Sequence, residues 1–459
     1  MVSRRQFLGT LALATSNILF TGQPRLAALV TTSGSHQRQA QALCTEDVPA
    51  LLNLVATIEA LSTTFYYTAM TTADGFFAAL PTKYQRYLRA SLDADWFHYH
   101  YLTSQKSATP VTTTFYFAKN SFAAGHFADF LGILDQLETI AIAATLATLH
   151  RLSTLNEPVL AEIIGQMSAI EAEHRVVGRE LAQVAPPPPN NLCFQPATFF
   201  CVAEAQARLA PFLNGGSNTV AYPLPDQTAI TAAIGQDGVD QTIAPATNAS
   251  CQETVADILN SAAIAEAIGI TFYYGGIQAG FFAQLSQPQQ WYLQAALDEE
   301  RHHLDFLRQN GAAVPPAAFF FPANVFVDLS AFLTLLDTLE NLFIGTYLAA
   351  IQRFAQVGEF LLAEIAGQIL GVEAEHRVLG RVISGATLPN NLGLARASFT
   401  CVTEVVAALQ PFIEGNTQFT EQKPMPTLAE INSAVDRFGC TPVATATAPS
   451  MIYLPLLTK

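Results

Sequence analysis

Apolar residues recur along this chain every three or four positions, the spacing of amphipathic helices, rather than alternating with polar residues as in strands. In the first half this spacing predicts four long helices and a shorter fifth, near residues 47–70, 81–106, 122–153, 158–184 and 196–213. Pro158 suits the first turn of the fourth helix, and the prolines from 186 to 189 end it. We therefore expect an all-α fold.

The second half repeats this pattern, which predicts a tandem duplication. EALSTTFYYTAM from Glu59 matches EAIGITFYYGGI from Glu266, and AEIIGQMSAIEAEHRVVGR matches AEIAGQILGVEAEHRVLGR. Asn-Asn-Leu follows the fourth helix in both halves, and the connection between the second and third helices is the longest in each. Each repeat is thus predicted to be a four-helix bundle with one long crossover and an additional C-terminal helix.

The repeat divides the chain into five predicted parts. We assign residues 1–42 to an export signal, 43–213 to bundle 1, 214–250 to a linker rich in Gly, Pro, Asn and Thr, 251–413 to bundle 2, and 414–459 to a C-terminal tail. The sequence SRRQFL from Ser3, followed by an apolar stretch, is similar to a twin-arginine signal, and two chance arginines are the alternative. Ala40-Gln41-Ala42 offers a cleavage site, with Ala27-Ala28 as an earlier one. The expected location is periplasmic or extracellular.

The composition is unusually apolar, with 50% hydrophobic and 13% charged residues. No transmembrane span is predicted, because Asp337, Glu340 and Asn341 interrupt the best candidate before the ~18 apolar residues that a span needs. Bundle cores plus domain or subunit contacts account for the composition, which is compatible with a homo-oligomer. The formal charge of −15 argues against nucleic acid as a partner and favours cations.

Six cysteines fit an oxidising destination. In the repeat alignment Cys44 is equivalent to Cys251, and Cys201 to Cys401. Free buried thiols remain the alternative. The predicted disulfides are Cys44–Cys201, Cys251–Cys401 and, from the two remaining cysteines, Cys193–Cys440.

Each repeat also carries one carboxylate on each of two helices and a carboxylate–x–x–His step on each of the other two. Buried together, four carboxylates would repel one another, and two divalent cations would balance their charge. These segments contain no cysteine, which disfavours a structural zinc or iron–sulfur centre. Singly, such residues are more often solvated acids or core histidines. The candidate metal ligands are Glu59, Asp95, His98, Glu138, Glu171 and His174 in the first repeat, and Glu266, Glu300, His303, Glu340, Glu373 and His376 in the second.

Glu299 and His302 share the same three-residue spacing. The repeat, however, matches Glu299 to Ala94, so Glu300 and His303 are preferred as ligands.

Four further residues are candidates for supporting the ligands. Asp135 and Asp337 lie three residues before the third-helix glutamates and are placed to orient ligand histidines, with a solvated or capping role as the alternative. Tyr66 lies two turns beyond Glu59 and Tyr273 two turns beyond Glu266, each on the same face of its helix as that glutamate. They are candidates for electron or hydrogen-bond donors, and packing is the alternative.

With these motifs the chain resembles a tandem ferritin-like protein of the exported, twin-arginine kind, in the group that contains bacterial ferritin-like-domain and desiccation-related proteins. The resemblance covers both repeats and implies two iron or manganese ions per bundle, with iron preferred. Related bundles store iron, reduce or dismutate peroxide, or oxidise organic substrates. Asp95 departs from the expected glutamate, so the first site is expected to bind one metal more weakly or to hold a different metal.

The resemblance implies redox chemistry with oxygen or peroxide, of the ferroxidase or peroxidase kind, as an oxidoreductase. By analogy, Glu138 and Glu171, with Glu340 and Glu373, are candidates for bridging carboxylates. Two alternatives remain: a non-catalytic protein that binds or buffers iron or manganese, and a structural, stress-protective envelope protein. If only one bundle is active, the full glutamate set favours the second.

Overall fold

The computed structural model describes residues 44–182, 189–243 and 250–441. Long helices dominate this part of the chain, with only two small two-stranded sheets, so the predicted all-α class is confirmed. The predicted twin-arginine signal at residues 1–42 and both candidate cleavage sites lie outside the described residues.

Four long helices form the first bundle. They are α2 (Val48–Thr71), α3 (Thr82–Gln105), α4 (Phe127–Thr154) and α5 (Pro158–Leu181). The Asp47 carboxylate caps α2 by accepting a hydrogen bond from the Ala50 N–H, and Pro158 occupies the first turn of α5. The longest connection runs between α3 and α4, as expected for a crossover between the two helix pairs.

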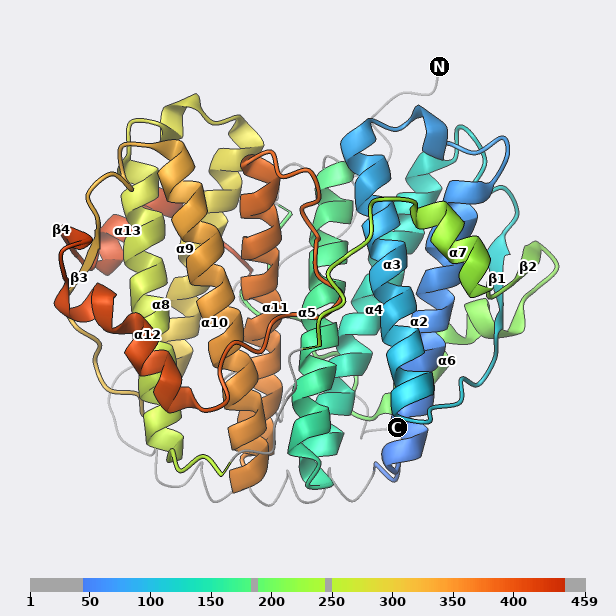
Figure 1. Cartoon of the computed structure of the whole chain (residues 1–459), viewed down its shortest axis with the longest axis horizontal. Coiled ribbons are helices and arrows are strands. Elements are labelled where there is room, and N and C mark those ends of the chain that lie inside the picture. The colour runs from blue at the N-terminus through green and yellow to red at the C-terminus, as the bar shows by residue number, and fades with distance from the viewer. Residues whose placement is uncertain (1–43, 183–188, 244–249, 442–459) are drawn as a thin grey trace, which may run out of the picture. The chain divides into compact units, whose positions relative to one another are not determined.

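The second bundle repeats this arrangement (Figure 1). Its helices are α8 (Val255–Gln278), α9 (Gln287–Gln309), α10 (Leu329–Val357) and α11 (Phe360–Ile383). Thr254 and Asp257 form a capping box at the start of α8. Gly358 follows the last residue of α10 as its C-cap, and its φ of +84° lies in the left-handed region that glycine adopts without strain.

Each bundle carries a further helix, a two-stranded sheet and a short terminal helix. The bounds are α6 (Val202–Asn214), α7 (Gln227–Ile234), β1 (Thr114–Ala118) and β2 (Thr219–Pro223) for the first bundle, and α12 (Val402–Glu414), α13 (Leu428–Val435), β3 (Ala318–Pro322) and β4 (Phe419–Pro424) for the second. β1 pairs with β2 and β3 with β4, both antiparallel. One strand of each sheet comes from the long crossover.

The sequence interpretation of residues 214–250 as a linker and of 414–459 as a tail missed β2, α7, β4 and α13. These segments pack back on their own bundle: the Gln294 side chain on α9, for example, donates to the Ala434 carbonyl in α13 at 2.7 Å. The strands escaped notice because each is short and its partner is remote in sequence, as where Thr114 pairs opposite Pro223.

Three disulfides are present, and they join the three predicted pairs, two expected from the repeat and one from the two remaining cysteines. Cys44–Cys201 and Cys251–Cys401 occupy equivalent positions, each fastening the segment before the first long helix to the start of α6 or α12. Cys193–Cys440 differs, since Gly393 and Val239 hold the equivalent positions in the other half. A Cβ added to Gly393 would lie 3.3 Å from Val239 Cγ2, so a plain packing contact replaces the bond there.

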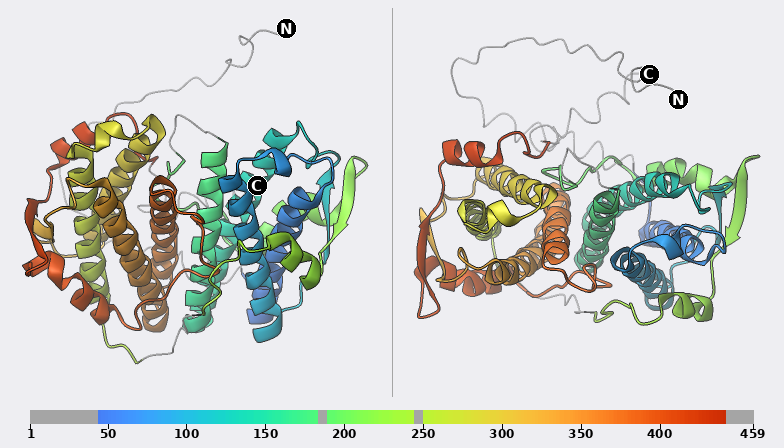
Figure 2. Two further views of the ribbon diagram at one scale, coloured as in Figure 1. Left: turned by 45° about the horizontal axis from the view of Figure 1, so that its top comes forward. Right: turned by 90° about the horizontal axis from the view of Figure 1, so that it is seen from above.

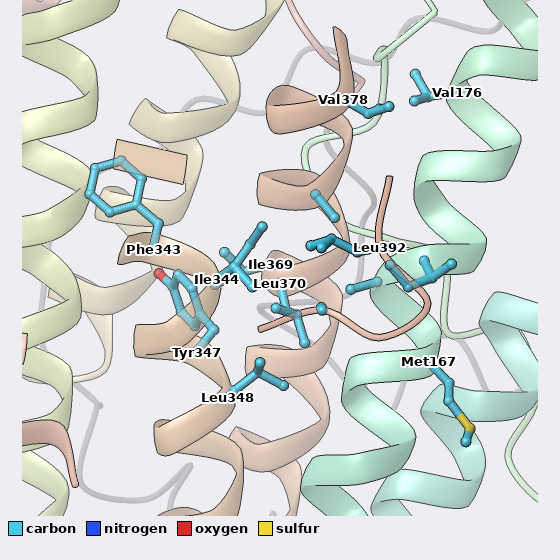
Figure 3. Packing of buried hydrophobic residues seen from close by; sticks show 14 of the residues in the cluster. Met167, Val176, Phe343, Ile344, Tyr347, Leu348, Ile369, Leu370, Val378 and Leu392 are labelled. Carbon is cyan, nitrogen blue, oxygen red and sulfur yellow. The ribbon is translucent and has the colours of Figure 1, made fainter. Parts of the chain in front are cut away.

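The two bundles pack against each other mainly through α5 and α11, which lie side by side in Figures 1 and 2. Two glycines on these helices make room for side chains of the opposite bundle: a Cβ on Gly367 in α11 would lie 2.9 Å from Leu146 Cδ2 on α4, and one on Gly165 in α5 would lie 3.1 Å from Ile351 Cδ1 on α10. Figure 3 shows the equivalent residues Val176 and Val378 pointing toward one another across this contact. Equivalent residues of the two bundles therefore make reciprocal contacts across this interface.

Two buried ion pairs are reciprocal in the same way, each with its arginine in one bundle and its glutamate in the other. The Arg175 guanidinium lies 2.7 Å from the Glu375 carboxylate, and Arg377 lies 2.6 Å from Glu173. Both pairs join α5 to α11, and all four side chains are at most 3% exposed. Removing one partner would leave a buried charge uncompensated, so these pairs tie the two bundles together.

Three of the described helices, α2, α4 and α8, are long and apolar enough to cross a membrane by length and composition alone. Between 67% and 78% of the most apolar window of each is buried inside the protein. The segment around Asp337, the strongest candidate by sequence, is not among these three. The absence of a membrane span stays a prediction.

Candidate metal centres

A cluster of buried carboxylates and imidazoles lies inside each bundle. The Asp95–His98 and Glu171–His174 steps each span one helical turn, so both members of each step project from one face of α3 or α5. In the first bundle all six predicted residues are at most 1% exposed: Glu59, Asp95, His98, Glu138, Glu171 and His174.

One end of the first cluster centres on His98. Its Nδ1 atom lies 3.2 Å from Glu59 Oε2 and 3.2 Å from Glu171 Oε1. With Asp95, these residues bring four candidate ligand atoms within 4.8 Å of one another. That spacing is suited to a single cation held by oxygen and nitrogen.

The other end centres on His174. Its Nδ1 atom lies 3.3 Å from Asp95 Oδ1, 3.7 Å from Glu171 Oε2 and 4.0 Å from Glu138 Oε1. Glu171 thus directs one oxygen to each histidine, and Asp95 borders both ends. Glu138, expected by analogy to share the bridging position, lies at the His174 end instead.

The second cluster has the same plan, and its six predicted residues are also at most 1% exposed: Glu266, Glu300, His303, Glu340, Glu373 and His376. His303 Nδ1 lies 3.3 Å from Glu266 and 3.2 Å from Glu373. His376 Nδ1 lies 3.3 Å from Glu300, 3.4 Å from Glu373 and 3.8 Å from Glu340. Glu373 again stands between the two histidines.

Many polar atoms of these clusters have no hydrogen-bond partner within the described residues. Buried oxygens without partners are costly in an apolar bundle, and bound cations would relieve that cost. Those in the clusters are Glu59 Oε1, both oxygens of Asp95, Glu138 Oε2, both oxygens of Glu171 and both nitrogens of His174, with both oxygens of Glu300, Glu340 Oε2, both oxygens of Glu373 and His376 Nδ1 in the second bundle.

Burial dominates the electrostatics of the carboxylates. It raises the pKa of Glu59 to about 8 and that of Asp95 to about 6, and the nearby charge of Glu171 adds to both. In the second cluster burial raises the pKa of Glu340 to about 8. Burial also acts to raise the pKa of Glu171, but hydrogen bonds from His174 and His98 outweigh it and the pKa is lowered. Positive ions would relieve this repulsion.

Tyrosine hydroxyls donate hydrogen bonds to one third-helix carboxylate in each cluster, Glu138 and Glu340. Tyr66 donates to Glu138 Oε1 and Tyr273 to Glu340 Oε1, each at 2.5 Å, which is the hydrogen-bonding role considered for them from sequence. In the second bundle Tyr347 also donates to Glu266, whereas the equivalent residue of the first bundle is Thr145. Sequence reasoning did not single out Tyr347.

The Asn-Asn-Leu segments reach across to the opposite bundle. The Gly393 carbonyl lies 2.5 Å from His98 Nε2, and the Cys193 carbonyl lies 2.7 Å from His303 Nε2. A carbonyl only accepts, so each Nε2 carries the proton and each Nδ1 is left to face the carboxylates. Each cluster is thus completed by main chain from the other repeat.

Asp135 and Asp337 do not contact a cluster histidine in the described part of the chain. Asp135 pairs with Arg179 at 2.7 Å, and Asp337 lies 3.4 Å from Arg381, because both aspartates lie toward the surface of their helix. A carboxylate outside the predicted ligand set, Glu299, does reach a cluster histidine: its Oε2 atom lies 2.7 Å from His376 Nε2. In the sequence, the three-residue spacing between Glu299 and His302 drew attention to this glutamate. Its histidine partner is instead His376, on another helix.

Comparison with known proteins agrees with this geometry. The ferritin-like domain family matches residues 254–385, which span α8 to α11 and include the whole second cluster. This segment is a ferritin-like domain. Searches of curated proteins and of solved structures found no match to the chain. The first bundle has the same order of long helices as this domain.

Proposed function

We propose that each bundle binds two iron or manganese ions, with iron preferred, in a dinuclear carboxylate site. The observation that supports this most directly is the set of buried carboxylate oxygens and histidine nitrogens that converge without other partners in the described structure. Oxygen and imidazole donors suit iron and manganese, and four carboxylates balance two divalent ions in charge. The match of the second bundle to the ferritin-like domain family adds to this.

The contacts suggest a role for each residue of the first cluster. Glu171 and Asp95, which border both histidines, are the candidates for bridging ligands. Glu59 and His98 would complete one metal position, and Glu138 and His174 the other. The equivalent roles in the second cluster fall to Glu373 and Glu300 as bridges, with Glu266 and His303 at one position and Glu340 and His376 at the other.

Bound as reduced ions, such a metal pair would supply electrons to oxygen or peroxide, which is ferroxidase- or peroxidase-like chemistry. The protein would hold and shield it. The histidines present Nδ1 because carbonyls accept from Nε2 of His98 and His303. Tyr66 and Tyr273 steady the third-helix carboxylates. The apolar surroundings keep bulk water away from the cluster.

We also propose that the protein works outside the cytoplasm. Its three disulfides fit an oxidising compartment, and the N-terminal sequence is similar to a twin-arginine signal. Periplasmic and extracellular locations are both consistent with these features.

Ferrous titration of the metal-free protein under anaerobic conditions, followed by exposure to air, tests the proposed chemistry. Repeated cycles of oxygen uptake and iron oxidation are the expected result. A single oxidation equal to the bound iron would instead indicate a non-catalytic iron-binding protein. Bound metal that air leaves unchanged would contradict redox chemistry and favour a structural role. Glu171→Ala and Glu373→Ala in one chain provide the control without either cluster.

A further inference from the structure

The two clusters differ at the histidine on the fourth helix of each bundle. His376 Nε2 lies 2.7 Å from Glu299 Oε2. The equivalent nitrogen, His174 Nε2, has no hydrogen-bond partner among the residues that the structure describes. The cause lies in the sequence, since α3 has Ala94 where α9 has Glu299.

The inner nitrogens of these histidines, the Nδ1 atoms that face the cluster carboxylates, do not show this difference. Nδ1 of His174 and of His376 each lies 3.3 Å from a carboxylate oxygen, of Asp95 and Glu300 respectively. A carboxylate on the outer nitrogen keeps the proton there, holds the ring in place and makes the inner nitrogen a stronger donor to a metal. Glu299 therefore changes how His376 can bind a metal without touching the metal position itself.

Glu299 is held in place from the other bundle. The Asn190 side-chain amide donates to Glu299 Oε2 at 3.1 Å and to the Tyr292 carbonyl at 3.3 Å. In the first cluster Asn390 makes the equivalent pair of bonds, to Ser91 Oγ at 3.1 Å and to the Tyr87 carbonyl at 3.3 Å.

In both halves an asparagine of the opposite repeat therefore hydrogen-bonds the second helix, but the side chain that accepts the bond differs. In the second bundle Ala296 stands at the position of Ser91, and Glu299 takes over as the acceptor for the asparagine. Only this acceptor also reaches a histidine. Glu299 Oε2 is shared between a donor from bundle 1 and the cluster of bundle 2, and its Oε1 atom has no partner in the described ranges.

We infer that Glu299 is a positioning residue that acts through His376 and gives the second cluster the tighter hold on its metal ions. The inference rests on the proposed function, because it concerns the same metal sites. Other differences, among them Asp95 against Glu300 and Thr145 against Tyr347, also separate the clusters. The test must therefore change Glu299 alone.

Cobalt(II) binding measures the effect without any turnover. Glu171→Ala disables the first cluster, so this variant reports on the second cluster through equilibrium dialysis and the visible absorption of bound Co²⁺. Adding Glu299→Ala is expected to weaken Co²⁺ binding by about 10- to 100-fold and to alter the absorption spectrum. Glu299→Gln, whose amide oxygen still accepts from His376, is expected to recover most of the affinity.

The matched control places Glu299→Ala in the Glu373→Ala background, where only the first cluster remains. Binding there is expected to stay unchanged, which shows that the substitution has not disturbed the fold. Unchanged affinity and spectrum on adding Glu299→Ala to Glu171→Ala would overturn the inference and leave the proposed function standing. Failure of both parent backgrounds to bind Co²⁺ would overturn the proposed function, and this inference with it.

Discussion

The two bundles present equivalent metal ligands in different surroundings. Both clusters place a central glutamate between two histidine Nδ1 atoms, and both bury all six side chains. The clusters differ at one ligand position, Asp95 against Glu300, and at neighbouring positions that include Ala94 against Glu299 and Thr145 against Tyr347. The comparison teaches that a duplicated site can keep the positions of its ligands while one ligand and the groups around the ligands diverge. We expect the two sites to bind the same metals with different strength.

The bundles are nevertheless interdependent. Each cluster takes a main-chain acceptor from the other repeat, Gly393 for His98 and Cys193 for His303. The two ion pairs between α5 and α11 also bury charged groups whose partners lie in the opposite bundle. The unit that builds the sites is therefore the pair of bundles.

The largest effect is expected where the two halves are most alike. Arg175→Met leaves Glu375 buried without its cation, which should lower the free energy of unfolding by about 3–5 kcal/mol in denaturant titrations. Arg377→Met, which removes the equivalent partner of Glu173, should cost a comparable amount.

The double variant Arg175→Met/Glu375→Met sharpens this prediction. It removes both buried charges and should recover most of the loss. A double variant no more stable than Arg175→Met would show that lost packing, rather than an unpaired charge, causes the effect.

A smaller loss is expected where the halves differ covalently. Replacing Cys193 by Gly and Cys440 by Val copies the Gly393–Val239 contact of the other half. The double substitution should lower the free energy of unfolding by about 2–4 kcal/mol, because the unfolded chain loses a cross-link. Denaturant titrations without reductant provide the measurement. Equal stability of the variant and its parent would mean that this disulfide adds nothing to the packing already present.

The remaining effect depends on pH, and each pH unit contributes less than either of the changes above. Glu162 on α5 accepts a hydrogen bond from Gln352 on α10, whereas the equivalent Glu364 lies 2.8 Å from His150. Burial raises the pKa of Glu162 to about 8, and the bond from Gln352 offsets only part of this. Because the folded pKa is above the unfolded value, the contribution of Glu162 to stability is complete below about pH 4.5 and is lost as the pH rises through about 8.

Glu162→Gln should therefore gain stability relative to its parent as the pH rises from 5 to 8, by at most about 1.4 kcal/mol per pH unit. Glu364→Gln, which removes the partner of His150 at the equivalent position, is the matched variant for comparison. Unfolding curves at both pH values measure the difference. The prediction for Glu162 is wrong if Glu162→Gln and its parent keep the same separation at pH 5 and pH 8.

The long helices and the cluster residues could be predicted because their signals are local and repeated. Glu171 and His174 share a helical turn, and the same step recurs at Glu373 and His376. The short helix expected near residue 196 begins only at Val202, because residues 193–201 form an extended connection that includes two bonded cysteines.

The remaining features depend on contacts between distant residues. Glu299 was set aside because the repeat matched it to Ala94, and only the fold shows that it meets His376 on another helix. That Asn190 and Asn390 each bond to the opposite bundle could not be predicted from the sequence. The identical Asn-Asn-Leu segments would fit contacts within one bundle equally well.

Metal analysis of the protein purified from its native host tests the central claim most directly. The proposal predicts about four iron or manganese ions per chain, with about two lost in Glu171→Ala and about two in Glu373→Ala. Protein that carries no iron or manganese when it leaves its host, or variants that keep the full complement, would contradict the assignment of the two clusters as metal sites.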